Sequence, residues 1–123
     1  MKQIGKQMKQ TFIFLICTLL TSALHAQVFK SDGEIYQLVV KNKAIQGGNT
    51  SFVEIKGFNE AGSCPKGGVY IKAVIPDEES GDRMYSLLLS AALSKTEVEI
   101  QVDTSHVNSE GYCYLRNVRY VFR

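Results

Sequence analysis

The sequence predicts a mainly β domain with one α-helix, in the order β-β-β-α-β-β. Residues 82–94 have the periodicity of an amphipathic helix, and residues 97–103 then change to the alternation of a half-buried strand. The other apolar segments are short, rich in β-branched residues, and separated by stretches that contain glycine, proline or asparagine. This pattern is typical of strands and their turns.

A secretory signal peptide is indicated by residues 1–26. A lysine-containing start precedes an apolar run over residues 12–20, which is too short to span a bilayer as a stop-transfer segment. Small and polar residues follow, so we expect cleavage after Ala26 or, as the second choice, after Ala23. The processed protein would be secreted or periplasmic, with one domain over residues 27–123 and no integral membrane segment.

Processing changes the charge of the chain. All 12 acidic residues but only 11 of the 14 lysines and arginines lie beyond residue 26, which gives the processed chain a formal net charge of −1. General binding of nucleic acid requires a basic surface, because most of its affinity comes from contacts to phosphates. We therefore expect no nucleic-acid partner.

Three strands are expected before the helix, over residues 34–42, 51–57 and 69–75. Glycines and an asparagine at residues 47–49 mark the turn between the first two strands. The third strand places its apolar side chains on one face, and Pro76 ends it because proline cannot donate to the strand ladder.

The helix over residues 82–94 carries a broad apolar surface. At about 100° per residue its apolar side chains span roughly 240°, whereas a surface helix needs only a little over 100°. Ser80 or Asp82 is expected to cap the N-terminus by accepting hydrogen bonds from free backbone N–H groups. Two explanations of the broad surface remain open: contact with another subunit, or deep burial in its own domain.

Two strands are expected after the helix, over residues 97–103 and 113–122, with a polar loop over residues 104–111 between them. The resulting order is that of an OB-fold, a small five-stranded Greek-key barrel. The main alternative is an open antiparallel sheet with the helix packed on one face.

A disulfide between Cys64 and Cys113 is consistent with the OB topology. The third and fifth strands of that fold are parallel neighbours, so their first residues lie close together. Cys64 stands just before the third strand and Cys113 begins the fifth, and a disulfide requires Cα atoms within about 7 Å of each other. Cysteine pairs of exported proteins are usually oxidised, so we expect this bond to form.

No catalytic set is expected. Asp103, Ser105 and His106 have the residue types of a catalytic triad, but three near neighbours on one turn cannot easily form the required line of nucleophile, base and orienting acid. Glu97 and Glu99 project from one face of a strand and are expected to be solvated. The processed chain would keep two cysteines and one histidine, which do not complete a tetrahedral metal site. We expect a protein that is not an enzyme and has no metal or cofactor.

Two segments resemble the B subunits of pentameric A–B-type bacterial toxins, of the subtilase cytotoxin type. The segment SDGEIYQLVV at residues 31–40 is similar to the first strand of that family, and TEVEIQV at residues 96–102 is similar to its passage from helix to strand. The helix end SAALSK at residues 90–95 does not match the aromatic-rich helix end of the family.

The resemblance implies an exported, non-catalytic module that binds a glycan, sialoglycans included, on the side of an OB barrel. A serine near the start of the family's first strand contacts sialic acid, and Ser31 takes that position. We expect Asp32 and Glu34 of the same segment to lie at the ligand. Tyr114 is a further candidate, because tyrosine rings stack on sugars, although in strands they more often pack in the core.

Partners also follow from the resemblance. It implies a homo-oligomer, a pentamer, formed through the helix at residues 82–94, and an enzymatic A subunit that would associate with it. The alternative function is an OB-type domain of the cell envelope that binds or supports other proteins and has no sugar ligand.

Overall fold

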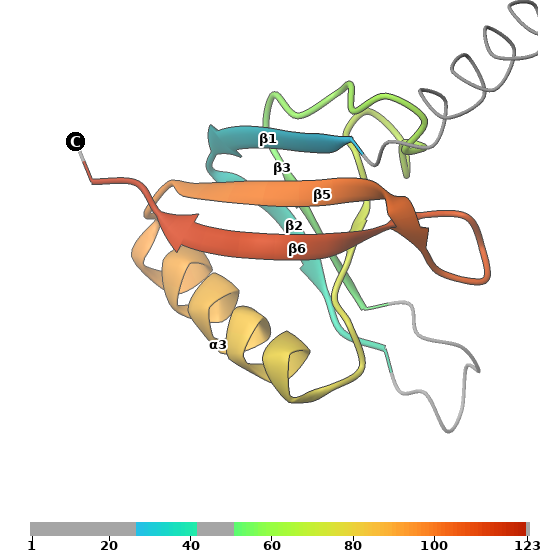
Figure 1. Cartoon of the computed structure of the whole chain (residues 1–123). Helices are drawn as coiled ribbons and strands as arrows, with labels where there is room; N and C mark the ends of the chain where they lie inside the picture. Colours follow the sequence, from blue (N-terminus) through green and yellow to red (C-terminus); the bar gives the residue numbers. More distant parts are fainter. Residues whose placement is uncertain (1–26, 42–50, 123) are drawn as a thin grey trace, which may run out of the picture.

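A six-stranded mixed sheet and one helix make up the described part of the chain, residues 27–41 and 51–122, in this computed structural model (Figure 1). The elements are β1 Val28–Gly33, β2 Ile35–Val39, β3 Phe52–Ile55, β4 Ala73–Val74, α3 Glu79–Ser94, β5 Val98–Val107 and β6 Cys113–Tyr120. The sheet has the order β1-β5-β6-β4-β3-β2, and its pairs are antiparallel except for β4 and β6, which are parallel. The mainly β class with one helix is therefore confirmed.

The expected five-stranded, partly open Greek-key barrel is not formed, because the structure has an open sheet of six strands. β1 lies before the first strand expected from the sequence, and β2 retains only the middle of that strand. The alternative was an open antiparallel sheet. The sheet is open, as this alternative expects, but it is not wholly antiparallel, because β4 and β6 are parallel.

The division between β1 and β2 has a local cause at Gly33 and Glu34. A Cβ on Gly33 would lie 2.6 Å from the carbonyl oxygen of Lys56, so only glycine fits at this approach of two backbones. The N–H of Lys56 donates to the carbonyl of Glu34 at 2.9 Å. β1 and β2 are the two edge strands of the sheet, since β1 pairs with β5 and β2 pairs with β3. In the chain these two edges are separated by Glu34 alone, so the sheet must curl to bring them together.

The hydrophobic core lies between the curled sheet and α3. Val98, Ile100 and Val102 of β5 are fully buried, as expected, but Glu99 and Asp103 on the opposite face are buried as well, so the expected half-buried alternation is only partly confirmed. Leu88 and Ala91 of α3 are also fully buried, and the helix packs against β2 and β6 (Figure 1).

The helix begins earlier than expected. It covers Glu79–Ser94, and its N-cap residue is Glu78, so the expectation that Ser80 or Asp82 caps the helix is wrong. The side chain of Glu78 makes no capping hydrogen bond. Gly81 packs against the backbone of Pro76 so closely that a Cβ would collide with its carbonyl oxygen. This contact brings the start of the helix onto the segment that follows β4.

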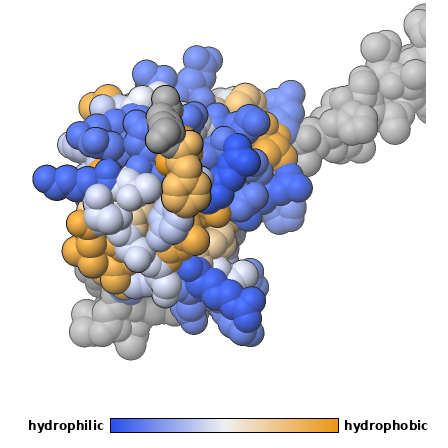
Figure 2. Space-filling view, turned by 90° about the vertical axis from the view of Figure 1, so that its left-hand side faces the viewer, coloured by the Kyte–Doolittle hydropathy of each residue, from blue (hydrophilic) through white to orange (hydrophobic). Residues whose placement is uncertain are grey.

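One part of the apolar surface of α3 remains exposed. Leu89 is 39% exposed and Leu93 is 79% exposed, so the domain itself does not bury the whole helix. Phe122, beyond the end of β6, is 85% exposed. Figure 2 views the side on which α3 ends and β6 leaves the sheet, and it shows apolar groups between polar ones. Deep burial in the domain is therefore wrong as the explanation of the broad surface.

The disulfide between Cys64 and Cys113 is confirmed, with the two Cα atoms 5.5 Å apart. Both cysteines are buried, and the bond ties the loop before β4 to the first residue of β6. β4 itself is shorter than expected, because residues 66–71 form a tight turn closed by a bridge between Lys66 and Ile71. The expected signal peptide and the turn at residues 47–49 lie outside the described residues.

Candidate functional site

A cleft of about 750 Å³ lies where the segment before α3 passes the last residues of β5 and the first residues of β6. The segment before the helix contributes Pro76, Asp77 and Glu78, β5 contributes Asp103 and His106, and β6 contributes Tyr114, Leu115 and Arg116. The lining residues thus include one tyrosine, three acidic residues, an arginine and a histidine.

A large bulge in β5 forms one wall of this cleft. The β5–β6 register pairs Val102 with Leu115 and then Val107 with Cys113, so residues 103–106 of β5 lie opposite Tyr114 alone. Bulges of this kind interrupt the ladder and direct side chains away from the regular pleat. The polar loop expected over residues 104–111 is therefore partly wrong, since residues 104–107 belong to the bulged strand.

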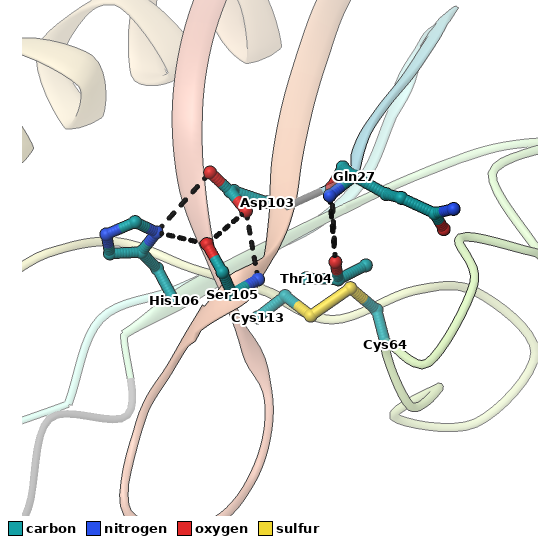
Figure 3. Close-up of polar contacts among 7 residues, drawn as sticks. All are labelled: Gln27, Cys64, Asp103, Thr104, Ser105, His106 and Cys113. Atoms are coloured by element: carbon teal, nitrogen blue, oxygen red, sulfur yellow. Dashed lines mark hydrogen bonds and ion pairs between the residues drawn. A yellow bond between two sulfur atoms is a disulfide. The ribbon is translucent and has the colours of Figure 1, made fainter. Parts of the chain in front are cut away.

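Asp103, Ser105 and His106 converge within the bulge (Figure 3). Oδ1 of Asp103 accepts hydrogen bonds from the Ser105 backbone N–H at 2.9 Å and from the Ser105 hydroxyl at 2.7 Å. Nδ1 of His106 lies 2.9 Å from the Ser105 Oγ and 3.3 Å from Oδ2 of Asp103. The Ser105 hydroxyl and N–H, together with His106, hold the pKa of Asp103 below its ordinary value.

The geometry of this group differs from that of a catalytic triad. In a triad the base uses one ring nitrogen for the nucleophile and the other for the orienting acid. Here Ser105 and Asp103 both contact the same nitrogen, and the Ser105 hydroxyl is within hydrogen-bond reach of the carboxylate. The arrangement is suited to fixing the position of the imidazole, whose second nitrogen lies on the side of the ring away from both partners (Figure 3).

Tyr114 and Arg116 form the opposite wall on β6. Tyr114 is half-buried and pairs with Val74 of β4, and it directly follows the disulfide-bonded Cys113, so its backbone is held from two sides. Arg116 is exposed and forms no ion pair with any carboxylate among the described residues, although three carboxylates line the same cleft.

Comparisons with protein-family models, with curated proteins and with solved structures found no match to this chain. Within residues 27–41 and 51–122 there is no group of three or more side chains suited to hold a metal ion, and no helix is long and apolar enough to cross a membrane.

The four ligand-binding residues expected from the sequence do not lie together. Tyr114 lines the cleft, whereas Ser31, Asp32 and Glu34 lie on β1 or just after it. Ser31 is paired with the buried Ile100 and so shares its core-facing side. Asp32 is paired with Glu99 on the outer face, and Glu34 forms an ion pair with Lys56 at 3.1 Å.

Glu99 is less solvated than the alternation suggests. Its side chain is only 10% exposed, and Arg119 on the adjacent β6 donates to it at 2.8 Å. This hydrogen bond is the main reason that the pKa of Glu99 lies below its ordinary value. The pair belongs to the outer face of the sheet and does not line the cleft.

Three residues of the cleft were not expected from the sequence as site residues: Asp77, Glu78 and Arg116. The acidic pair precedes a helix, where acidic residues are common for electrostatic reasons, so its position carries no functional signal. Arg116 follows Tyr114 by two residues on one strand, and this aromatic–arginine spacing is the one signal that pointed to a shared surface.

Proposed function

We propose that this protein is an exported, non-catalytic domain that binds carbohydrate in the cleft between residues 76–78 and strands β5 and β6. The observation that carries the proposal is the set of residues that line the cleft, in which Tyr114 occurs together with charged residues of both signs. Binding sites for small polar molecules typically combine an apolar surface with a few well-placed polar groups.

A sugar ring fits this combination chemically. One face of a pyranose carries mainly C–H groups and can stack on Tyr114, while its hydroxyls both donate and accept hydrogen bonds. Carboxylates such as that of Asp77 can accept from these hydroxyls, and Arg116 can donate to them. The bulge and the disulfide support the proposal, because they hold the two walls of the cleft in place before a ligand arrives.

Export and the toxin B-subunit relationship are part of the same proposal. A disulfide in a chain of this size favours an oxidising compartment, secreted or periplasmic. The strand order supports an OB-type arrangement, since β1 and β2 can be regarded as two halves of one bent strand and β4 runs parallel to β6. An enzymatic A subunit would then be the protein partner.

The second candidate function is protein binding through α3. The exposed Leu89 and Leu93 favour it, because apolar side chains that lie next to each other on one helix face commonly mark a contact surface. In that case α3 would associate with copies of itself or with another envelope protein, and the cleft would have no role in the contact.

The test is a glycan array probed with the purified protein, followed by NMR titration of the best glycan. We expect Tyr114→Ala to weaken binding by about tenfold or more, which is the usual effect of removing a stacking ring. Tyr36→Ala is the matched control, because Tyr36 is 56% exposed and lies outside the cleft. An array without hits among neutral and acidic glycans, or equal losses in both variants, would refute the proposal.

A further inference from the structure

Strand β1 is held in the sheet by one neighbour, β5. Each of its six residues pairs with a residue of β5, and its other edge is an open edge of the sheet. The preceding Gln27 also bonds to β5, because its carbonyl accepts from the Thr104 N–H at 3.0 Å and its N–H donates to the Thr104 hydroxyl at 3.2 Å. Phe29 is the one side chain of β1 that packs against the hydrophobic core. The β5 of another copy of the chain could supply the same ladder.

The connection from β1 to β2 is one residue long, although the two strands are opposite edges of the sheet. Glu34 is held beside β3, because its carbonyl accepts from the Lys56 N–H at 2.9 Å and its carboxylate pairs with the Lys56 Nζ at 3.1 Å. Gly33 is held on β5, where it pairs with Val98. The chain therefore passes from one edge of the sheet to the other between two consecutive residues.

This bend is crowded at Gly33. A Cβ at this position would lie 2.6 Å from the Lys56 carbonyl oxygen, so a side chain would require the backbone to shift. The pairing of β2 with β3 is also irregular directly after the bend, because the register shifts between Ile35 and Gln37. Short connections under constraint favour the exchange of an element between two copies of a chain, since the exchanged form keeps the contacts without the bend.

We propose that β1 is an exchangeable strand, and that the edge of β5 which it covers is a binding site for the β1 of a second copy of this chain. When Gly33 and Glu34 straighten, β1 and β2 form one continuous strand that crosses between two molecules. Each copy then completes the sheet of the other in a dimer with two-fold symmetry. The contact involves neither the cleft nor the exposed side of α3, so it is independent of both proposed functions.

The balance between monomer and dimer depends on the bend. The β1–β5 pairs are the same in both forms, so they favour neither. The constraint at Gly33 favours the dimer, whereas the loss of translational and rotational freedom on association favours the monomer. The dimer should therefore form at high protein concentration, and it should separate slowly, because β1 must leave β5 before the two chains can part.

The first experiment is size-exclusion chromatography with light scattering on the purified protein, equilibrated over a range of concentrations. We expect a dimer whose share grows with concentration and which persists for some time after dilution. Leu93→Ala is the control, because it removes the leucine of α3 that is 79% exposed and should leave the dimer unchanged. Loss of the dimer in Leu93→Ala, or a monomer at every concentration, overturns the inference.

Variants at the bend should act in opposite directions. Gly33→Ala should raise the ratio of dimer to monomer by about tenfold or more, because the added Cβ collides with Lys56 only in the bent form. Gly68→Ala is the matched control, since a Cβ there meets nothing within 4 Å. Insertion of two glycines between Gly33 and Glu34 should lower the ratio by about tenfold, because a longer connection can turn back without constraint.

The two variants together decide whether the bend drives association. A Gly33→Ala variant that remains a folded monomer overturns the inference. If this variant does not fold, the insertion decides alone, and a ratio that it leaves unchanged overturns the inference.

Isotope-filtered NMR shows which strand is exchanged. The dimer is assembled from an equal mixture of isotope-labelled and unlabelled chains. We expect NOEs between Ser31 and Ile100, which lie opposite each other in the β1–β5 pairing, to connect a labelled chain with an unlabelled one. If these NOEs occur only within one chain, β1 stays on its own β5, and the inference is overturned even for a protein that dimerises.

Discussion

Ser105 and Asp103 show how neighbouring side chains set a charge in this cleft. The pKa of Asp103 is lowered mainly by hydrogen bonds from Ser105, so the folded state binds a proton less readily than the unfolded state does. The resulting stabilisation is present above the ordinary aspartate pKa of about 3.9 and is lost as the pH falls through the lower value in the folded state.

We therefore expect Ser105→Ala to lower the free energy of unfolding at neutral pH and to have a smaller effect at acidic pH. Urea denaturation followed by circular dichroism at several pH values measures both effects. Ser86→Ala is a suitable control, because the Ser86 hydroxyl on the exposed face of α3 donates to a backbone carbonyl, which does not titrate. A loss in Ser105→Ala that is the same at every pH would contradict this account.

At the level of single residues, the expectation that depended on side-chain chemistry alone, the disulfide, was confirmed. The Cys64–Cys113 pair could be named because only these two cysteines lie beyond the expected signal peptide, which leaves few alternatives. The contacts of Asp103, Ser105 and His106 could not be foreseen, because they require the four-residue bulge opposite Tyr114. That bulge depends on the partner strand, and the sequence of β5 alone contains no sign of it.

Two leucines of α3 lie in opposite surroundings. Leu88 is fully buried and Leu93 is 79% exposed. We expect Leu88→Ala to lower the free energy of unfolding by about 2–5 kcal/mol, because the change removes buried apolar surface and leaves a cavity. Leu93→Ala should change it by less than about 0.5 kcal/mol, as is usual for a surface position.

The same leucine pair tests what covers the exposed side of α3. Denaturant unfolding and light scattering should be measured for both variants over a range of protein concentrations. If Leu93→Ala destabilises as strongly as Leu88→Ala, the side chain is buried in solution, and association through α3 must be the reason. A monomer with an unaffected Leu93→Ala variant would remove the second candidate function.

The order of elements was predictable in part, and the closure of the sheet was not. The helix and the two strands after it follow the expected order, but four strands precede the helix instead of the expected three. The parallel neighbours β4 and β6 agree with the OB topology expected from that order. The open, curled sheet depends on Gly33 meeting the carbonyl of Lys56, more than 20 residues away. A contact of this kind between distant backbones leaves no periodic signal, and the first expected strand, residues 34–42, therefore did not include β1.

The disulfide links the stability of the whole molecule to the site. It joins positions 49 residues apart, and a loop of this length gives about 4 kcal/mol in the chain-entropy model. We expect a Cys64→Ala, Cys113→Ala double variant to lose about 2–4 kcal/mol in the free energy of unfolding, measured by urea denaturation. The alanines replace two buried sulfurs, so a small packing loss adds to this effect.

The same double variant should bind ligand less tightly, because Cys113 holds the start of β6 immediately before Tyr114. The measurement is the glycan titration repeated well below the melting temperature, so that the variant remains folded throughout. Treatment of the unmodified protein with a reductant in mild denaturant should reproduce both losses, and this comparison controls for the alanine substitutions themselves. A variant that is less stable but binds unchanged would show that the parallel pairing of β4 with β6 alone is enough to position Tyr114.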